Sequence, residues 1–480
     1  MISPFLMAGA AFVLFVAIVV LRALAFRPDR IAVTDTPAPQ FSAKELASRL
    51  SRMIQIATVS SRDETQVEWK AFERFRALIE SLYPKVSSTC ERHLVGTSGV
   101  VYRLKGQRSD NPTVLMAHYD VVSADSEGWT HPPFSGEIDG EGVLWGRGAI
   151  DTKITVCAIL EALERHLEEG FVPAHDLFLS FSGDEEIMGP SAPAIVSWME
   201  GKGIKPALVL DEGGAVVTNV FPGVSKPCAV VGISEKGVLD IEFSVEAAGG
   251  HASAPPVRQP VVSLARAIDK MDANPFSSRL TPASRMMFDA LGRHSTFGFK
   301  ILFANLWCFL PVLQLVCTLT GGELAALMHT TVCFTILGGS DAYNVMPLAA
   351  RSGANCRLLQ GDTADSAFAR LESLAKSEGV SARKVYAFDP SPVSDCSGPG
   401  WSRIQHAISA TWPDAVIAPY LMVACTDSRH FSRICRNVYR FSAMALSKEE
   451  RSTMHARNER IPIEKISTAT AFFWRVIASA

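Results

Sequence analysis

Three consecutive acids, Asp184, Glu185 and Glu186, lie in the stretch "LFLSFSGDEEIMG" at residues 177–189, directly after an apolar run of β-forming residues. Carboxylates in such a position serve as metal ligands or as general bases. Acids also favour the N-terminus of a helix, so a helix cap explains this one run equally well. The other strand-like runs of the sequence decide between a cap and a polar centre.

Histidine and acids recur at the ends of other β-rich runs. "TVLMAHYDVV" contains His118 and Asp120, "ALVLDEGG" contains Asp211 and Glu212, and Asp151 lies in the glycine-rich turn of "GRGAIDTK". Ionised carboxylates that converge at the edge of a core repel one another and cost several kcal/mol unless a cation compensates. We therefore predict a metal centre. Imidazole and carboxylate without thiolate suit zinc, with manganese or cobalt as substitutes.

Between residues 95 and 235, short β-rich runs alternate with helical segments such as "TVCAILEALERHLEEG". This alternation predicts an α/β fold with a mostly parallel sheet that helices cover on both faces. Sheets of this kind bind ligands at the carboxyl ends of their strands, where the acids and the histidine lie. The predicted elements therefore bring these side chains to one edge.

The composition is that of a globular protein. The chain has 480 residues, 48% of them hydrophobic, which is enough for two or three domains with real cores. A net charge of -3 without a long basic run argues against nucleic acid as the main partner and favours small molecules or peptides. The ten cysteines show no Cys-x-x-Cys spacing, so we predict buried free thiols and no disulfide framework.

The N-terminus is a different kind of sequence. Every side chain from residue 5 to 21 is apolar or small, and with its continuation to residue 26 the run is long enough to span a bilayer. It lacks the positive residues that precede a signal-peptide core, which favours an uncleaved anchor over a cleaved signal peptide. We predict a transmembrane helix at residues 1–28 and a linker at 29–42. The basic residues after the run favour a cytoplasmic body, but so few charges leave both sides of the membrane open.

A second apolar stretch, "FKILFANLWCFLPVLQLVC" at residues 299–317, is also long enough to resemble a membrane span. It contains Asn305 and Pro311, and a proline inside the run breaks one continuous helix. We therefore interpret it as a buried or partly exposed pair of helices in a soluble domain.

Taken together, "HYDVV", "GRGAIDTK", "SGDEE" and "LDEGG" resemble the motifs of the two-zinc metallopeptidase family that includes carboxypeptidase S, aminoacylase and carnosine dipeptidase. The resemblance runs from about residue 45 to the C-terminus. Within the family, the chain is most similar to carboxypeptidase S and to the N-fatty-acyl-amino-acid synthase/hydrolase. The blocks "SEKGVLDIEFSV", "GGHASAPP", "NVMPLAA", "TDSRHF" and "MHARNERI" occur in the same order.

The resemblance implies two zinc ions and assigns their ligands. His118 binds one ion, Asp151 bridges the pair, and the remaining ligands are Glu186, Asp211 and His455. A shift of one residue would make Glu212 the ligand in place of Asp211. His455, as a lone histidine after a charged segment, would otherwise be read as a surface residue.

The same resemblance assigns roles to the remaining polar residues. Glu185 is left without a metal and is expected to act as general base, taking a proton from water and returning it to the leaving amine. Asp120 lies two residues beyond His118, so on a strand both side chains point the same way and the carboxylate can orient the imidazole. Arg429, in "TDSRHF", is expected to bind a substrate carboxylate through its planar fork, the alternative being a surface salt bridge.

The family resemblance also implies an inserted α+β lid of the order β-α-β-β-α-β. We expect catalytic segments at residues 43–235 and 396–480 and a lid or dimerisation domain at 236–395. The lid is expected to supply His251 and Asn344 to polarise the scissile carbonyl, in some relatives across a dimer interface.

These features predict a zinc-dependent metallopeptidase or amidohydrolase that hydrolyses peptides or N-acyl amino acids with a free carboxylate. A dipeptidase or short-chain aminoacylase is the alternative within the enzymes. A catalytically silent binding module is disfavoured because neither the base nor a ligand is missing, and a serine hydrolase because no Gly-x-Ser-x-Gly elbow occurs. The apolar segment at 275–330 suggests a long acyl chain as substrate, with lid packing as the alternative. The residues proposed to contact that chain are Phe299, Leu302, Phe303, Leu306, Trp307, Phe309, Leu310 and Leu313.

Overall fold

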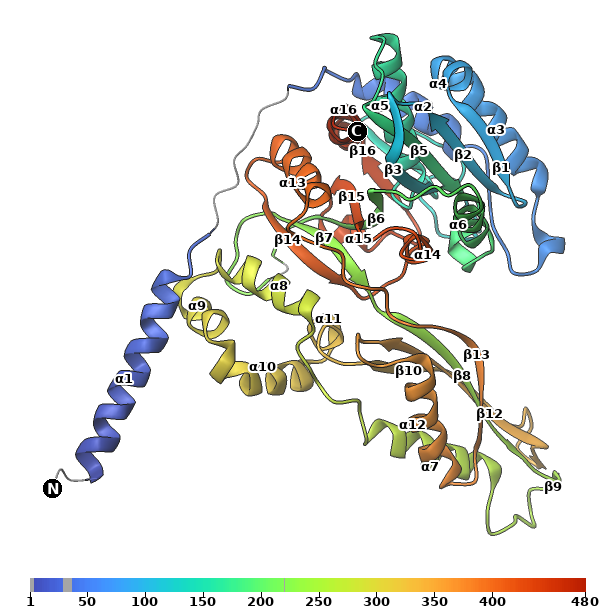
Figure 1. Ribbon diagram of the computed structural model, residues 1–480. Helices are drawn as coiled ribbons and strands as arrows, with labels where there is room; N and C mark the ends of the chain where they lie inside the picture. The colour runs from blue at the N-terminus through green and yellow to red at the C-terminus, as the bar shows by residue number, and fades with distance from the viewer. Residues whose placement is uncertain (1–3, 29–36, 220) are drawn as a thin grey trace.

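The computed structural model describes residues 4–28, 37–219 and 221–480, and most of the predicted linker at 29–42 lies outside these residues. Figure 1 shows a larger lobe, a smaller elongated lobe, a group of helices between them and one long N-terminal helix beside that group. We call the helices α8 to α11 the helical arm. They are α8 (Pro282–Gly292), α9 (Phe297–Ala304), α10 (Leu306–Thr320) and α11 (Gly322–Ala326).

The larger lobe is built on an eight-stranded sheet with the order β1-β2-β5-β3-β6-β15-β7-β14. The pairs β3–β5, β3–β6, β6–β15 and β7–β14 are parallel, whereas β1–β2, β2–β5 and the contacts of β7 with β6 and β15 are antiparallel. The strands are β1 (Glu91–Val95), β2 (Gly99–Leu104), β3 (Arg108–His118), β5 (His175–Ser182), β6 (Leu208–Val217), β7 (Cys228–Glu235), β14 (Val416–Met422) and β15 (Val438–Ala445).

The sheet is therefore mixed, which corrects the expectation of a mostly parallel one. Its centre, β5-β3-β6-β15, is parallel, as the alternation of strands and helices predicted. The antiparallel edge arises because β1 and β2 are joined by a short turn, and a connection of that length can join only antiparallel strands.

Helices cover both faces of this sheet, and strand β3 shows how the sequence divides between them. Val114 and Met116 pack in a core with α6, while Leu115 and Ala117 pack in the main core with α5 and α16. The helices of this lobe are α2 (Ala43–Ile54), α3 (Trp69–Leu82), α4 (Pro84–Thr89), α5 (Lys153–Glu168), α6 (Ser191–Gly201), α13 (Pro399–Thr411), α14 (Ser428–Phe431), α15 (Lys448–Arg451) and α16 (Ile463–Ala478). Short 3-10 turns η1 (Glu64–Gln66) and η2 (Glu185–Ile187) and the pair β4 (Val143–Trp145) with β16 (Arg460–Pro462) complete it.

The smaller lobe is an antiparallel four-stranded sheet of the order β10-β12-β8-β13. Its strands are β8 (Gly237–Glu246), β10 (Thr331–Gly338), β12 (Ala349–Leu358) and β13 (Ser381–Phe388). Helices α7 (Pro260–Asp272) and α12 (Ala364–Lys376) pack on it and share a core with Leu239, Ile241 and Phe243. The short strands β9 (Gly250–His251) and β11 (Val345–Met346) pair with each other, and Figure 1 shows β9 at the far end of this lobe.

The helical arm separates α7 from β10 in the chain and packs on the larger lobe through α8, which contacts β14. The apolar stretch 299–317 forms two helices, as expected, but the break lies at Asn305 and not at Pro311, which is inside α10. The backbone of Asn305 has φ -124 and ψ 35, which is not helical, and α9 and α10 meet there at a bend of 108°.

Helix α1 (Pro4–Ala25) is long and apolar enough to cross a membrane, and it packs against α9. Among the described residues it is the single unbroken helix that has this length and hydropathy.

Candidate active site

The carboxyl ends of three adjacent strands bring the predicted polar residues together. His118 is the last residue of β3, and Glu185 and Glu186 form the turn η2 directly after β5. Glu212 lies in β6 just beyond the segment that pairs with β3. Because β3 lies between β5 and β6 and runs parallel to both, these ends meet at one edge of the sheet.

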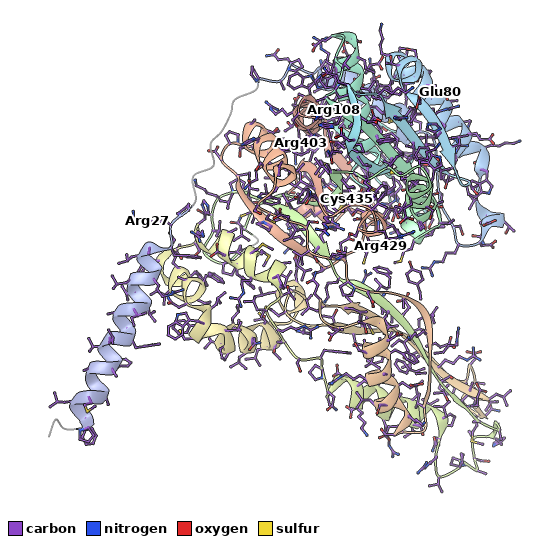
Figure 2. All side chains as sticks on the ribbon, in the orientation of Figure 1. Arg27, Glu80, Arg108, Arg403, Arg429 and Cys435 are labelled. Atoms are coloured by element: carbon purple, nitrogen blue, oxygen red, sulfur yellow. The ribbon has the colours of Figure 1, made fainter. Side chains whose placement is uncertain are left out.

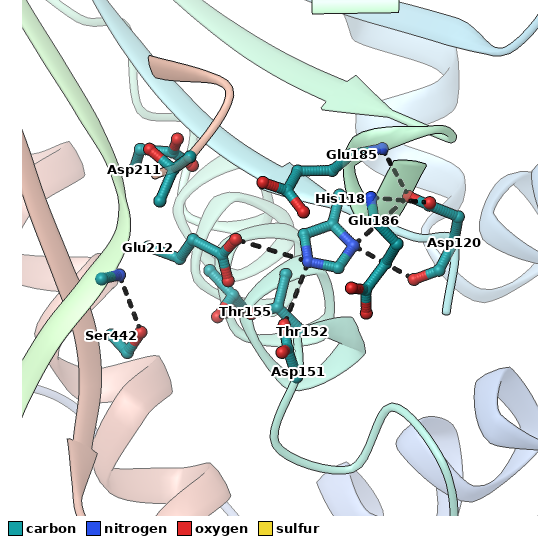
Figure 3. A network of polar contacts seen from close by, with 12 residues as sticks. His118, Asp120, Asp151, Thr152, Thr155, Glu185, Glu186, Asp211, Glu212 and Ser442 are labelled. Atoms are coloured by element: carbon teal, nitrogen blue, oxygen red, sulfur yellow. Dashed lines mark hydrogen bonds and ion pairs between the residues drawn. The ribbon is translucent and has the colours of Figure 1, made fainter. Parts of the chain in front are cut away.

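One group of candidate metal ligands forms around His118, whose side chain is buried. Its Nε2 lies 3.0 Å from Oδ1 of Asp151 and 3.4 Å from Oε1 of Glu212. The imidazole is directed at both carboxylates, as Figure 3 shows. The three side chains offer ligand atoms within 4.8 Å of one another.

A second group forms on the other oxygen of Asp151. Nε2 of His455 lies 3.0 Å from Oδ2 of Asp151 and 3.0 Å from Oε2 of Glu186. The His455 side chain is 54% exposed, and its backbone has a positive φ of 58° between α15 and β16. Asp151 thus belongs to both groups, one oxygen to each.

Asp211 belongs to neither group, although the family resemblance named it as a ligand. Its Oδ2 accepts a hydrogen bond of 3.0 Å from the backbone N–H of Ser428. Side chains alternate along a strand, so Asp211 and Glu212 point to opposite faces of β6, and Glu212 is the one beside His118. The structure therefore places Glu212, the alternative ligand one residue further along, in the group around His118.

Without a cation, bound protons compensate the negative charge of these groups. Burial raises the pKa of Glu212 to about 8, and hydrogen bonds that the His455 ring donates to the carboxylates of Asp151 and Glu186 raise the pKa of His455 to about 10. Burial would raise the pKa of Asp151, but the contacts of both histidines outweigh it and hold the pKa well below its usual value. Buried Oε1 of Glu186 finds no hydrogen-bond partner among the described residues. This donor set fits a divalent cation in each group.

Asp120 connects the strand ends to one another. Its oxygens accept hydrogen bonds from the backbone N–H groups of Glu185 at 3.1 Å and Glu186 at 3.2 Å, and from the hydroxyl of Ser60 at 2.7 Å. Nδ1 of His118 lies 3.3 Å from Oδ1 of Asp120 and 3.1 Å from its backbone oxygen. Asp120 therefore holds both the imidazole and the turn η2.

Sequence reasoning missed Glu459, which positions the loop that carries Asp151. This buried carboxylate accepts hydrogen bonds from the backbone N–H groups of Ile150 at 2.7 Å and Asp151 at 3.1 Å, and from Nη1 of Arg147 at 2.7 Å. Its place in "MHARNERI", four residues after His455, was the available signal.

Glu185 lies beside both groups without being a member of either. Its carboxylate faces the space next to Glu212 and His118, as Figure 3 shows. Burial, together with the negative charge of Glu212, raises the pKa of Glu185 well above the usual value, although His118 opposes this. A carboxylate whose pKa is raised takes up a proton more readily than an exposed one, as a general base must.

Arg429 is buried in α14 at the side of the larger lobe that faces the smaller lobe (Figure 2). Its Nη1 donates to the backbone oxygen of Thr426 at 2.7 Å, and its guanidinium lies 4.8 Å from the ring centre of Phe388. Nε and Nη2 find no hydrogen-bond partner among the described residues. Two buried donors of one guanidinium thus remain available, and the predicted alternative of a surface salt bridge does not describe this environment.

His251 and Asn344 lie far from these groups. His251 is in β9, and Asn344 precedes β11 and accepts a hydrogen bond of 3.0 Å from Ala252. Figure 1 places β9 at the end of the smaller lobe that points away from the larger lobe. Within one chain, the structure does not bring these two residues to the strand-end site.

An apolar cavity of about 510 Å³ opens from the candidate ligands. Asp151, Glu186 and Glu212 are among the residues that line it. Its apolar walls come from β6, β14, β15, α8, α11 and the loops near them, and include Val217, Phe221, Met287, Leu291, Leu324, Leu327, Met422, Met444, Leu446 and Met454. None of the eight residues that the sequence suggested for an acyl chain lines this cavity.

The chain matches the model of the family described as Peptidase family M20/M25/M40 over residues 114–479. It is 35% identical to the N-fatty-acyl-amino acid synthase/hydrolase PM20D1 of Xenopus tropicalis, over 91% of this chain and 86% of that one. It is also 35% identical to the probable carboxypeptidase S-like 2 of Dictyostelium discoideum, over 90% and 84%. Among solved structures, an M20 family metallo-carboxypeptidase of Sulfolobus solfataricus shares the fold with a TM-score of 0.68 at 17% identity, over 90% and 98%. The resemblance inferred from the motifs is confirmed, and the chain belongs to peptidase family M20/M25/M40 as a metallopeptidase or amidohydrolase.

Proposed function

We propose that this chain is a two-zinc amidohydrolase that cleaves the amide bond of N-acyl amino acids with a free carboxylate. The observation that carries the proposal is the geometry of Asp151, whose two oxygens belong to two different ligand groups, with Glu185 beside both and in neither. A single carboxylate shared in this way suits a pair of divalent ions.

The ligands of the proposal are His118 and Glu212 on one side, Glu186 and His455 on the other, and Asp151 between them. Glu212 replaces Asp211, which the family resemblance had suggested. Nitrogen and carboxylate ligands without thiolate favour zinc, with manganese or cobalt as substitutes. Bound there, the two ions would supply Lewis acidity toward a carbonyl oxygen and lower the pKa of water.

Glu185 acts as general base in this proposal. Its raised pKa suits a group that takes a proton from water and then gives it to the leaving amine nitrogen. Asp120 positions it, because the Asp120 carboxylate holds the backbone N–H of Glu185 and the ring of His118 at the same time. Glu459 holds the Asp151 loop in the same way.

Arg429 is proposed to bind the substrate carboxylate. Its free Nε and Nη2 form the edge of a guanidinium that carboxylates bind bidentately. We expect Arg429→Lys to raise KM for N-acyl amino acids far more than for the corresponding N-acyl amino amides, which lack the carboxylate. Arg433→Lys is the matched control, since Arg433 is an exposed arginine nearby that pairs with Glu200. Equal effects of Arg429→Lys on both substrate classes would contradict the assignment.

The apolar cavity supports a long acyl group in preference to a short one. Its lining combines the candidate ligands with methionine, leucine and phenylalanine side chains. The Xenopus relative is named for N-fatty-acyl amino acids, and the Dictyostelium relative for a carboxypeptidase. We propose fatty-acyl amino acids as substrates, with dipeptides as the alternative.

His251 and Asn344 are proposed to reach the site of a second subunit. Edge strand β10 of the smaller lobe exposes Ile336 and Leu337, and the loop to β12 exposes Leu348, which suits a contact between copies of this lobe. Mixing His251→Ala subunits with Glu185→Gln subunits tests the arrangement. Activity regained on mixing two inactive variants would support complementation across a dimer, and continued inactivity of mixed dimers would contradict it.

Helix α1 is proposed to anchor the chain in a membrane. It is 22 residues long, carries no acidic residue and exposes most of its apolar side chains. Such a surface is unfavourable in water.

One experiment tests the proposed activity as a whole. The purified full chain is analysed for bound metal and assayed against N-acyl amino acids of increasing acyl length and against dipeptides, before and after chelation. We expect close to two zinc ions per chain, loss of activity on chelation and recovery with zinc. Full activity in a metal-free sample would contradict the proposal.

A further inference from the structure

Helix α1 does not lead away from the body of the protein but lies against the helical arm. The amide Nδ2 of Asn305 donates a hydrogen bond of 3.0 Å to the backbone oxygen of Val19. Nε and Nη2 of Arg22 donate to the backbone oxygen of Ala304 at 3.2 and 3.1 Å. The ring of Trp307 meets the ring of Phe15 edge to face at 6.0 Å. These contacts all fall at the junction between α9 and α10.

These contacts lie along the half of α1 that is nearer the body of the protein, at a depth that falls within a bilayer if α1 spans it. A helix of 22 residues is about 33 Å long, close to the thickness of about 30 Å of a bilayer's hydrocarbon core. Phe15 lies about halfway along α1, and Val19 one turn further toward the body. An α1 that spans the membrane therefore carries Trp307 and Asn305 into the hydrocarbon with it.

The outer surface of α10 suits that environment, and Lys300 in α9 is the one charged side chain of these two helices. No charged residue occurs from Ile301 to Gly322. Leu306, Leu313 and Cys317 of α10 are buried against the protein. The opposite side of α10 is both apolar and exposed, and the Leu319 side chain there is 77% exposed. This side consists of Trp307, Val312, Leu315, Val316 and Leu319. An amphipathic helix at a water-facing surface would carry polar residues there.

The side-chain N–H groups of Asn305, Trp307 and Gln314 are paired within the protein, as a membrane requires. Nδ2 of Asn305 also donates to the backbone oxygen of Ile301 at 2.9 Å, and its Oδ1 accepts from Nε1 of Trp307 at 3.2 Å. Nε2 of Gln314 donates to the backbone oxygen of Ser278 at 3.0 Å. The asparagine that argued against a membrane location in the sequence is therefore no obstacle to one.

Basic side chains mark the expected border with the lipid headgroups. A cavity of about 1000 Å³ at the C-terminal end of α1 is lined by Arg22, Lys226, Arg285 and Arg293, together with the acids Asp289 and Asp414. Cations at this level suit the phosphate layer above the hydrocarbon, into which long basic side chains extend.

We infer that α9 and α10 lie in the bilayer beside α1 and form a second, re-entrant membrane element of the chain. The inference rests on the proposed anchoring by α1. It also places the apolar cavity next to the membrane, because α11 follows α10 directly and contributes Leu324 and Leu327 to the cavity wall. A fatty-acyl substrate then reaches the site from the bilayer and not through water.

Tryptophan reporters in the full chain test this placement. In a Trp307→Phe background, Leu315→Trp places a reporter on the outer face of α10, and Val172→Trp is the matched control on the larger lobe. The two native side chains are equally exposed, at 58% and 57%. Each protein is reconstituted into phosphatidylcholine vesicles with and without bromine on the acyl chains. After subtraction of the emission of the seven remaining tryptophans, measured in the Trp307→Phe parent, we expect brominated lipid to quench the Leu315 reporter severalfold more than the Val172 reporter. Aqueous iodide should do the reverse. Leu319→Trp is a second reporter on the same face.

Flotation of the vesicles separates the inference from the proposals beneath it. A chain that floats with vesicles while its α10 reporters are quenched no more than Val172→Trp overturns the inference and leaves the anchor in place. A chain that does not float overturns both. Hydrolysis of N-acyl amino acids, measured in the same samples, reports separately on the proposed activity.

Discussion

The strand-end site and the helical arm are built on opposite principles. At the site, Asp120, Asp151 and Glu459 each hold several partners through hydrogen bonds or ion pairs, so these side chains and their partners determine one another's positions. In the arm, the outer residues of α10 touch little of the protein, and their chemistry is uniform. Polar residues specify one geometry, whereas apolar residues specify only an environment.

The difference appears in how the two regions can be misread from sequence. Among the expected metal ligands the discrepancy was one residue, Asp211 in place of Glu212, because alternation along a strand turns neighbours to opposite faces. In the arm the helices were expected, but their break and their surroundings were not. Pro311 fits within α10, and the stretch breaks at Asn305, whose side chain bonds to Val19 of α1, 286 positions away in the chain.

Replacement of the proposed base gives the largest expected effect. Glu185→Gln keeps the shape of the side chain and removes its ability to take a proton, so kcat should fall by about 10²–10⁴-fold or more while bound metal stays unchanged. Glu186→Gln, at the next position, should lose metal as well as activity, because Glu186 lies 3.0 Å from His455 in a ligand group. Metal analysis and steady-state kinetics of both variants check this.

Equal loss of metal in the two variants would show that the roles of Glu185 and Glu186 are misassigned. Retention of activity in Glu185→Gln would remove the base from the proposal altogether.

The next prediction tests whether Glu212 or its neighbour Asp211 in β6 is the metal ligand. Glu212→Gln should lower the affinity for metal by more than the roughly 10–100-fold that loss of an outer hydrogen-bond partner costs. Asp211→Asn should change it little, because an amide oxygen can still accept from the N–H of Ser428 and burial already raises the pKa of Asp211. Competitive metal titration measures both. A larger loss in Asp211→Asn would restore the family's assignment.

Much of the larger lobe could be predicted from its sequence. The runs that became β3, β5 and β6 were identified with their polar ends, since a buried parallel strand is a short apolar run and an acid at its end is conspicuous. The hairpin of β1 and β2, which makes the sheet mixed, carries no such mark. The cavity wall escaped prediction because Met287, Leu324 and Met444 come from three distant segments, and only the tertiary fold brings them together.

The next prediction concerns how the metal affinity of the strand-end site depends on pH. In the metal-free site burial raises the pKa of Glu212 to about 8, and Asp151 and Glu186 raise the pKa of His455 to about 10. A cation binds the deprotonated forms, so each must release a proton. Affinity should therefore rise with pH, by about tenfold per unit for each proton released, and fall as pH drops below 8. Competitive titration of the chelated chain at several pH values measures this, and affinity independent of pH below 8 would contradict it.

The smallest expected effect concerns the apolar cavity and the length of the acyl chain that it binds. Each acyl methylene that enters the cavity should contribute about 0.8 kcal/mol, or roughly fourfold in kcat/KM, until the cavity is filled. Leu324→Trp, on α11, fills part of the cavity, so the rise of kcat/KM with acyl length should stop at a shorter chain while short substrates are hydrolysed as before. Leu315→Trp is the matched control, since Leu315 lies on the outer face of α10 and does not line the cavity.

A series of N-acyl amino acids of increasing chain length, assayed with both variants, gives the profile of kcat/KM against acyl length. If the wild-type profile is flat, the cavity does not bind the acyl chain, and the result favours the alternative that the enzyme is a dipeptidase. If Leu315→Trp shortens the profile as much as Leu324→Trp does, the chain binds along the arm, as the sequence first suggested, and not in the cavity.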